Sequence, residues 1–373
     1  MLESRDSAGV ACGHGVGQQI RTVVIDALAA RYGGAAYATL HMASELADVQ
    51  HIAGVVVIAR AGSLVAEGAS SRADLRLVAL PDARRLELLR RVAWQAVRLP
   101  RLLRAESPAV LVTWSGMLPR RSRSPVICYL ANPLVFARGG LGNRLRRWAV
   151  RRTASAATHV LVPTAGMGEF VEKELGRRPD VAPLGVDRAA FRPAAWPGDE
   201  IICVGDPYRH KRHEVLLAAW SALRAPRPRL RLIGDLRVDR GHAANLTRLV
   251  RRHRADGEIV LQTGLAHDEL VRAYHAARVF VLTSEHESFC LPLLEAQACG
   301  VPAVVRDLPA LRESSGGAAV FVSGDDPGAW AAAVTRLLTD DAAHAAVRAA
   351  GLANAERSGW ERTAAAIRDR ALA

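Results

Sequence analysis

The segment VFVLTSEHESFCLPLLEAQACGVP, residues 279–302, decides the fold. Its first four residues form a continuous apolar run, which is typical of a strand buried on both faces. Pro292 stands where the first turn of a helix tolerates proline, and Gly300 followed by Pro302 ends that helix. A buried strand that passes through a polar loop into a helix predicts α/β structure. The helix N-terminus is then expected at the carboxyl edge of a parallel sheet.

The same alternation of apolar runs and helical stretches extends over the whole chain. Helical patterns such as residues 215–223 and 330–338 lie between the runs, so the repetition predicts parallel sheets with helices on both faces. The expected strands are residues 23–25, 55–58, 110–112, 126–129, 160–162, 201–204, 230–233, 259–261, 279–282, 303–305 and 319–322.

A proline-rich break over residues 180–197 separates two such halves, and a length of 373 residues suits two domains of ordinary size. We therefore expect an N-terminal Rossmann-like domain over residues 1–183, a linker over 184–197 and a C-terminal domain over 198–355. A last helix within residues 356–373 is expected to pack back on the N-terminal domain.

The charge of the chain predicts an acidic partner. The formal net charge is +13, and only two of the 50 basic residues are lysines, Lys173 and Lys211. Nucleic acid, anionic lipid and a phosphorylated ligand are the candidates. Because only 5% of the residues are aromatic and the chain has no recognised nucleic-acid-binding motif, we expect no nucleic-acid partner.

The five cysteines are scattered along the chain, and none is paired with a histidine at zinc-ligand spacing. This pattern predicts a reduced, cytoplasmic protein without a structural metal. No apolar run reaches the roughly 20 residues that cross a bilayer.

The helix that begins near Pro292 is expected to present free backbone N–H groups, which favour phosphate binding. Glu295 lies in this helix, where its carboxylate would accept hydrogen bonds from a ribose. Glu287, eight residues earlier in the loop, would face the group that is attached to the phosphates. The structural alternative is that both are ordinary acids near a helix N-terminus. The amides concerned are those of Phe289, Cys290 and Leu291.

A second candidate loop is CVGDPYRHKRH, residues 203–213, which follows a buried strand. Lys211 and Arg209 would neutralise a diphosphate whose charge grows as a sugar departs. The alternative is a solvated basic helix start, although cations are unfavourable at that end of a helix. His210 and His213 are interpreted as surface residues.

These two segments resemble the retaining glycosyltransferases of family 4, which have the GT-B fold. In that family two glutamates separated by seven residues follow a strand, as Glu287 and Glu295 do around Phe-x-Leu-Pro. The resemblance implies that Glu287 contacts the donor sugar, Glu295 the ribose, and Arg209 with Lys211 the pyrophosphate, near Gly205. It also includes residues 295–302 and the interdomain sequence Gly-Val-Asp-x-x-x-Phe-x-Pro that begins at residue 185.

The resemblance implies a fold and a reaction. The fold is α/β GT-B, with two Rossmann-like domains whose parallel sheets face each other across a cleft. The reaction is transfer of a hexosyl group from a UDP- or GDP-sugar to a hydroxyl of a glycan or lipid-linked acceptor, with front-side attack and without a metal or cofactor. Cell-surface polysaccharide or glycolipid synthesis is the expected setting.

Two positions depart from the family pattern. Cys290 stands where glycine is usual, which is a small change if its backbone amide does the binding. Asp206 stands where many members have a phosphate-binding arginine, and we therefore assign that role to Arg209.

The N-terminal half offers weaker signals for the acceptor side. Gly33 and Gly34 open a helix over about residues 36–46, and paired glycines permit close approach of backbone to a phosphate or sugar. A plain turn explains them equally well. Asn132 follows the expected strand 126–129, near where the family often places a His or Asn that faces the transferred sugar.

Two basic stretches, residues 84–104 and 144–152, contain tryptophan and apolar residues among arginines. Basic amphipathic helices of this kind suit an anionic membrane surface, and the inner face of the cell membrane is then the expected location. The alternative is a solvated arginine-rich face over a core stripe.

Two other functions stay open. Another GT-B enzyme, such as a nucleotide-sugar epimerase, would need acid/base side chains from both domains, which the sequence does not identify. A non-catalytic binding module is disfavoured by the charged residues Glu287, Glu295 and Lys211. Asp325-Asp326 and Asp340-Asp341 are interpreted as loop and helix-cap acids rather than metal ligands.

Overall fold

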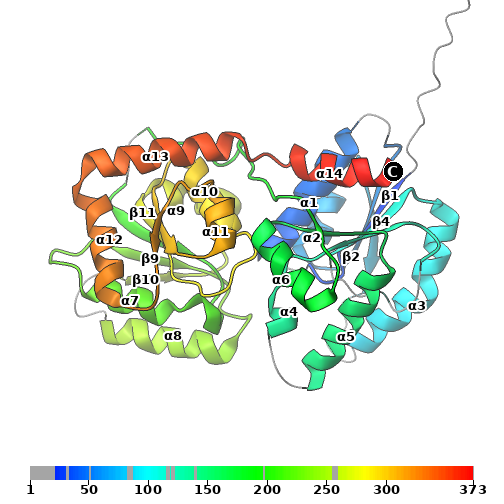
Figure 1. The fold of residues 1–373 in the computed structure, drawn as a ribbon, viewed down its shortest axis with the longest axis horizontal. Helices are drawn as coiled ribbons and strands as arrows, with labels where there is room; N and C mark the ends of the chain where they lie inside the picture. Colours follow the sequence, from blue (N-terminus) through cyan, green and yellow to red (C-terminus); the bar gives the residue numbers. More distant parts are fainter. Residues whose placement is uncertain are drawn as a thin grey trace, which may run out of the picture.

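The computed structural model describes residues 22–30, 33–49, 52–81, 87–114, 118, 122–137, 141–195, 198–253 and 259–372. These residues form two α/β domains that lie side by side, with the N-terminal domain on the right in Figure 1. Each domain is built on one parallel sheet.

The N-terminal sheet has the strand order β3-β2-β1-β4-β5-β6-β7, and all of its pairs are parallel. The order reverses direction between β1 and β4, which is where ligands collect in folds of this kind. The strands are β1 (Val23–Asp26), β2 (Val55–Arg60), β3 (Leu75–Leu80), β4 (Val110–Thr113), β5 (Val126–Tyr129), β6 (His159–Val162) and β7 (Asp180–Val181). The helices are α1 (Gly33–Asp48), α2 (Leu64–Ser70), α3 (Glu87–Glu106), α4 (Leu134–Ala137), α5 (Leu141–Ala156) and α6 (Ala165–Leu175).

The C-terminal sheet has the order β10-β9-β8-β11-β12-β13 and is also parallel, so its switch point lies between β8 and β11. Its strands are β8 (Glu200–Val204), β9 (Leu230–Ile233), β10 (Ile259–Gln262), β11 (Ala277–Leu282), β12 (Ala303–Arg306) and β13 (Val320–Val322). Its helices are η1 (Arg209–Lys211), α7 (His213–Ser221), α8 (Arg240–His253), α9 (His267–His275), α10 (Leu291–Ala298), α11 (Pro309–Ser314), α12 (Pro327–Thr339) and α13 (Asp341–Glu356), and the chain ends with α14 (Glu361–Leu372).

All eleven expected strands are present, and two more were missed. β3 is an edge strand whose middle residues are partly exposed, so it lacks the continuous apolar run of a central strand. β7 has two residues and is exposed. The expected break at residues 180–197 therefore begins with a short strand, because Val181 pairs with Val162 of β6.

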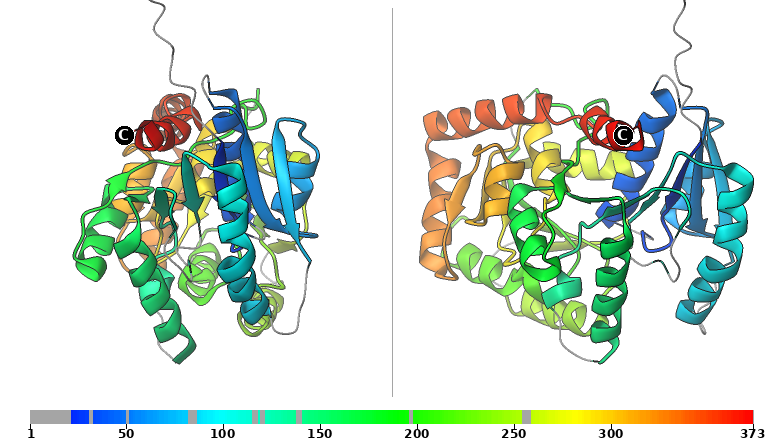
Figure 2. Two further views of the ribbon diagram at one scale, coloured as in Figure 1. Left: turned by 90° about the vertical axis from the view of Figure 1, so that its right-hand side faces the viewer. Right: turned by 45° about the vertical axis from the view of Figure 1, so that its right-hand side comes forward.

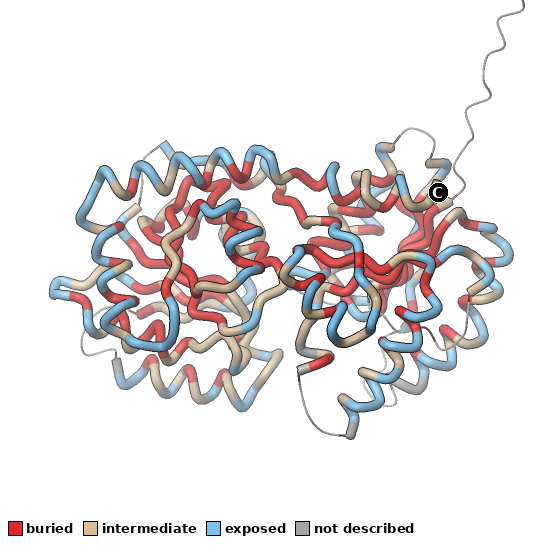
Figure 3. Tube along the Cα trace, viewed as in Figure 1, coloured by how far each residue is buried: buried red, intermediate tan, exposed pale blue. Residues whose placement is uncertain are grey.

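The buried side chains form a layer on each face of each sheet, and the strands lie buried at the centre of each domain (Figure 3). One core cluster is continuous through both domains. It joins the sheet faces covered by α1, α2 and α14 to those covered by α9, α10 and α13. The opposite faces carry separate clusters, one under α3, α5 and α6 and one under α7, α8 and α12. Contact between the domains is thus partly apolar.

The chain crosses between the domains twice at one place. After α13, the segment leading into α14 returns to the N-terminal domain, where α14 packs on α1 (Figures 1 and 2). Val186 N donates a hydrogen bond to Ser358 O at 2.9 Å. A Cβ at Gly185 would lie 2.4 Å from the backbone nitrogen of Trp360, so only glycine fits there. The His41 ring stacks on Trp360 with centroids 5.3 Å apart.

Candidate functional site

Two loops at the switch point of the C-terminal sheet are fixed to each other. The loop between β8 and α7 contains η1, and the loop between β11 and α10 follows the neighbouring strand. Thr283 Oγ1 donates hydrogen bonds to the backbone oxygens of Lys211 and Arg212, at 3.0 and 2.9 Å. Glu285 N donates to His210 O at 2.8 Å. The relative position of the two loops is therefore set before any ligand binds.

Lys211 and Glu287 form an ion pair between these loops. Lys211 Nζ donates a hydrogen bond to Glu287 Oε1 at 2.7 Å, and the two side chains are only 15% and 10% exposed. Burial acts to lower the pKa of Lys211, but the adjacent Glu287 carboxylate outweighs it and the pKa lies above its ordinary value. The ammonium therefore stays charged at neutral pH although it is largely removed from water.

An arginine network supports the second loop from beneath. Arg306 Nε donates to Thr283 O at 3.0 Å, and its guanidinium pairs with Asp325. Arg212, whose φ is +52°, also pairs with Asp325 and lies 3.5 Å from Glu285. Asp325 therefore acts as the loop acid that the sequence predicts. The predicted helix-cap acids Asp326 and Asp340 accept hydrogen bonds at the starts of α12 and α13.

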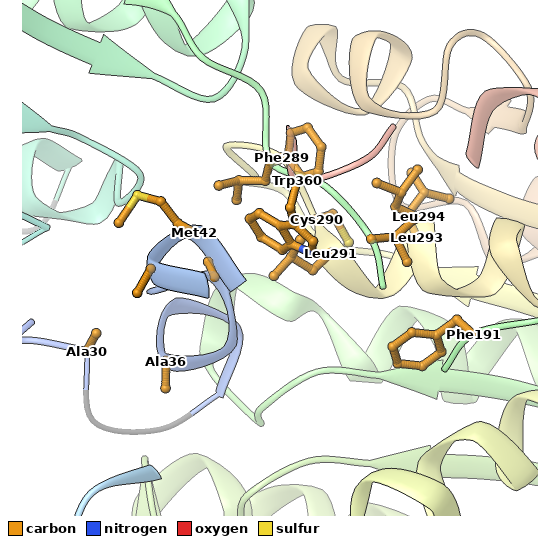
Figure 4. Close-up of a cluster of buried hydrophobic side chains, with 14 of the residues drawn as sticks. Ala30, Ala36, Met42, Phe191, Phe289, Cys290, Leu291, Leu293, Leu294 and Trp360 are labelled. Carbon is orange, nitrogen blue, oxygen red and sulfur yellow. The ribbon is translucent and has the colours of Figure 1, made fainter. Parts of the chain in front are cut away.

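The N-terminus of α10 opens beside this ion pair. Cys290, the residue before the helix, has φ +79° and ψ +80°, which is the left-handed region that favours glycine. This turn brings Phe289, Cys290 and Leu291 together with Trp360 (Figure 4), and all four are buried. In the first turn of α10, Pro292 has no N–H group and Leu293 N donates to Cys290 O at 3.2 Å. Helix N-termini carry a partial positive charge that favours anions.

Glu295 lies on α10 beneath that position. Tyr274 Oη donates a hydrogen bond to Glu295 Oε2 at 2.8 Å. Burial raises the pKa of Glu295 to about 7, although the Tyr274 hydroxyl acts to lower it. A narrow pocket next to Glu295 is bounded by rings, and the centroids of Tyr37 and His267 lie 5.8 Å apart and those of Phe191 and His267 5.0 Å apart.

The start of α1 in the N-terminal domain meets both loops. Gly33 has φ +65°, and a Cβ there would lie 3.6 Å from Asp206 Oδ2. A Cβ at Gly34 would lie 3.4 Å from the Leu291 side chain. Asp206 also accepts a hydrogen bond from Asp235 N at 2.9 Å, and burial raises its pKa. The Asp206 carboxylate thus connects the loop after β8 to the loop after β9.

Three polar contacts join the domains beside Glu287. Ser288 Oγ donates to Ala131 O at 2.6 Å, and Thr164 Oγ1 donates to Ser288 O at 2.9 Å. The Glu313 carboxylate accepts hydrogen bonds from Ala165 N at 2.7 Å and Gly166 N at 3.3 Å, at the N-terminus of α6. The loop that carries Glu287 is therefore bonded directly to the N-terminal domain.

The structure brings most of the predicted site residues together and places Arg209 and Asn132 beside them. Arg209 belongs to η1, which also contains Lys211, and Asn132 follows Ala131, whose backbone oxygen accepts a hydrogen bond from Ser288. Lys211, Glu287, Glu295, Gly205, Gly33, Gly34 and residues 289–291 surround the gap between the domains. Arg209 and Asn132 are exposed. His213 was predicted to lie on the surface, and this is wrong: it is 3% exposed beneath the loop, and burial lowers its pKa to about 3.

Sequence reasoning missed Tyr274, Ser288 and Thr164, which orient Glu295 and the loop of Glu287. No local motif marks them, since each acts on a residue brought near by the fold. Within the described part of the chain, no group of three or more His, Cys, Asp or Glu side chains is arranged to hold a metal ion. Of the helices described, none is long and apolar enough to span a membrane.

Two protein-family models match the chain. The model described as Glycosyltransferase Family 4 matches residues 32–190, and the model described as Glycosyl transferases group 1 matches residues 198–340. The matched segments include most of both domains, and both loops of the site lie in the second.

A curated relative, D-inositol 3-phosphate glycosyltransferase from Pseudarthrobacter chlorophenolicus, is 32% identical over 242 residues, which are 60% of this chain and 57% of that protein. The chain spans about half the length of the curated relatives it matches.

Two solved structures have the same fold. Sucrose-phosphate synthase from Thermosynechococcus elongatus superposes with a TM-score of 0.76 at 19% identity, over 94% of this chain and 98% of that one. HepE from Anabaena in complex with UDP-glucose superposes with a TM-score of 0.76 at 13% identity and the same coverage. At these identities the likeness shows the fold alone, which is the GT-B arrangement of two Rossmann-like domains.

Proposed function

The chain belongs to glycosyltransferase family 4 and has the GT-B fold, and from this premise we propose its reaction. It transfers a hexosyl group from a nucleoside-diphosphate sugar to a hydroxyl group of a glycan or lipid-linked acceptor, with retention of the anomeric configuration. The observation that carries the proposal is the buried Lys211–Glu287 pair beside the open N-terminus of α10.

The donor diphosphate lies between Lys211 and the backbone amides that precede α10. An ammonium held in a poorly solvated position and a helix N-terminus both stabilise the negative charge that develops on the departing diphosphate. Arg209 is near enough in sequence to approach the same phosphates from the outer side, since its exposed side chain is free to reorient. Glu287 holds the hydroxyl groups of the sugar, while Lys211 fixes the position of its carboxylate.

The nucleoside lies next to Glu295. Its carboxylate accepts hydrogen bonds from the ribose hydroxyls. The pocket that includes Tyr37, Phe191 and His267 has a volume of about 20 Å³, enough for one water molecule, so these rings must move apart before a base stacks on them.

The acceptor enters from the N-terminal domain. Gly33 and Gly34 at the start of α1 let its backbone approach the donor closely, and Asn132 lies at the end of β5 on the same side. The acceptor hydroxyl attacks from the face that the diphosphate leaves, and the diphosphate takes up its proton. Positioning and electrostatic stabilisation supply the catalysis, with closure about residues 185–193 excluding water.

Two basic helices of the N-terminal domain favour the interpretation that the acceptor is located at a membrane. α5 exposes Leu145 and Trp148 at 59% and 60%, and α3 exposes Val92 and Val97. Both lie at the periphery of the N-terminal domain (Figure 2), and apolar side chains among arginines bind anionic lipid surfaces. Arg91 faces the other way: it is buried with Gln95, whose amide donates to Asp26 at 2.7 Å. Sedimentation with anionic vesicles, compared between wild type and Trp148→Ser, tests this surface.

The proposed reaction is tested by incubating the full chain with UDP- and GDP-sugars and with glycan or lipid-linked acceptors. We expect release of one nucleoside diphosphate and a glycoside whose anomeric configuration, measured by NMR, equals that of the donor. Inverted product, or no transfer and no donor cleavage with any pair, would overturn the proposal.

A further inference from the structure

A pocket beside Glu287 is built from both domains and has largely apolar walls. It has a volume of about 170 Å³, large enough for several water molecules or for one substituent of a sugar ring. Met167 and Phe170 of α6 form one wall, and Leu308 and Ala310 at the start of α11 form the other. Figure 1 shows α6 and α11 facing each other where the domains meet.

The polar groups at this pocket already have partners or lie in solvent. Gly166 N donates to Glu313, and the Glu285 carboxylate lies 3.5 Å from the Arg212 guanidinium. His286 is exposed. Glu287 accepts a hydrogen bond from Lys211. Its carboxylate can accept further hydrogen bonds, and these are directed to the hydroxyl groups of a bound sugar. A sugar hydroxyl pushed between the apolar walls would lose its hydrogen bonds to water without replacement, which is unfavourable.

The pocket exists in this form because the domains are held together around it. Ser288 bonds Ala131, and Glu313 caps α6. A Cβ at Gly166 would lie 3.0 Å from Pro309 Cβ, so the two walls are in close contact at one end. Its shape is therefore set by packed backbone as well as by side chains.

We propose that this pocket selects a donor whose sugar carries a methyl-bearing substituent, that is, a 6-deoxy or an acetamido sugar, over the parent hexose. This inference rests on the proposed function, because it takes Glu287 as the residue that contacts the donor sugar. The methyl group lies between Phe170 and Leu308, while the neighbouring hydroxyls face Glu287. One methyl or methylene group in an apolar pocket discriminates by roughly 10- to 200-fold.

The test is calorimetric titration of the full chain with matched donor pairs. UDP-N-acetylglucosamine against UDP-glucose measures the acetamido group, and GDP-rhamnose against GDP-mannose measures the 6-deoxy methyl. UDP and GDP alone report on the nucleotide site. We expect the methyl-bearing member of one pair to bind about tenfold or more tightly, and the pair in which this occurs identifies the substituent.

Leu308→Asn makes one wall polar, at the cost of the packing of the half-buried Leu308 side chain on the core cluster that joins the domains. Leu308 precedes α11 with extended backbone and no side-chain capping bond, and asparagine is favoured at such a position. We expect this variant to bring the affinity ratio within a pair close to one. Val181→Asn, on the exposed edge strand β7, is the matched control and leaves the ratio unchanged.

Equal affinities within both pairs, tighter binding of the parent hexose, or a ratio that survives Leu308→Asn would overturn the inference while the proposed function stands. If neither the nucleotides nor any of the four donors bind, the proposed function fails as well.

Discussion

Replacing Lys211 by methionine removes one partner of the Lys211–Glu287 pair and leaves the Glu287 carboxylate without it. Breaking a buried ion pair in this way costs about 3–5 kcal/mol. The two side chains are 15% and 10% exposed and so keep some contact with water, and we therefore expect the lower end, about 3 kcal/mol. Methionine keeps the length and the apolar stem of lysine, so lost packing adds little.

Scanning calorimetry measures this cost as a shift in the unfolding temperature of the C-terminal domain. At about 2–4 °C per kcal/mol for a domain of this size, Lys211→Met lowers Tm by about 6–12 °C. The double variant Lys211→Met/Glu287→Gln has no unpaired charge, so it recovers at least about half of that loss. Lys173→Met is the matched control, because Lys173 is exposed, and it stays within about 2 °C of wild type.

The double-mutant cycle of Lys211→Met and Glu287→Gln can also refute the interpretation of this ion pair. If Lys211→Met behaves like Lys173→Met, or if the two single changes add without coupling, the pair is not the buried, dehydrated contact that the geometry describes.

Three further predictions concern neighbouring residues. Cys290→Gly relieves left-handed strain of about 1–3 kcal/mol and loses the packing of a buried side chain. The free energy of unfolding therefore rises by at most about 1 kcal/mol in a denaturant titration, and a lower midpoint contradicts this. The pKa of Glu295 is raised to about 7, so a ribose-binding carboxylate is lost as the pH falls through 7. Donor affinity then weakens about tenfold between pH 8 and pH 6, and Glu295→Gln gives a flat profile; an unchanged profile in that variant assigns the titration elsewhere. Glu313→Gln weakens the cap on α6 by about 0.3–1 kcal/mol and so weakens one contact between the domains. The radius of gyration of the free protein in X-ray scattering then increases, whereas identical scattering curves show that this contact does not hold the domains together.

The strands were predictable because burial on both faces of a parallel sheet demands continuous apolar runs. Strands at the edges of a sheet lack this continuous apolar run. β3 carries Arg76 and exposed residues, and β7 has two residues within a proline-rich segment. Both are ordered by pairing with a neighbouring strand, which leaves no local pattern in the sequence.

The centre of the site was predictable for a topological reason. The loops of Lys211 and Glu287 follow β8 and β11, and adjacent parallel strands bring their carboxyl ends to one edge. The residues that orient the site act over longer separations. Tyr274 reaches Glu295 from another helix, and Thr164 reaches Ser288 from the other domain. His213 was misjudged because a polar residue at the start of a helix usually faces water, whereas here the loop folds over it.

The central claim is that a nucleoside-diphosphate sugar binds between the Lys211 loop and α10. The most direct measurement is a thermal-shift screen of UDP, GDP and their common sugar conjugates against wild type, Lys211→Met and Lys173→Met. A ligand at 100 times its Kd adds about 2.7 kcal/mol of stability. The account predicts a clear rise in Tm with the conjugates of one base, retained in Lys173→Met and lost in Lys211→Met. An equal rise in both variants, or none with any nucleotide, would contradict it.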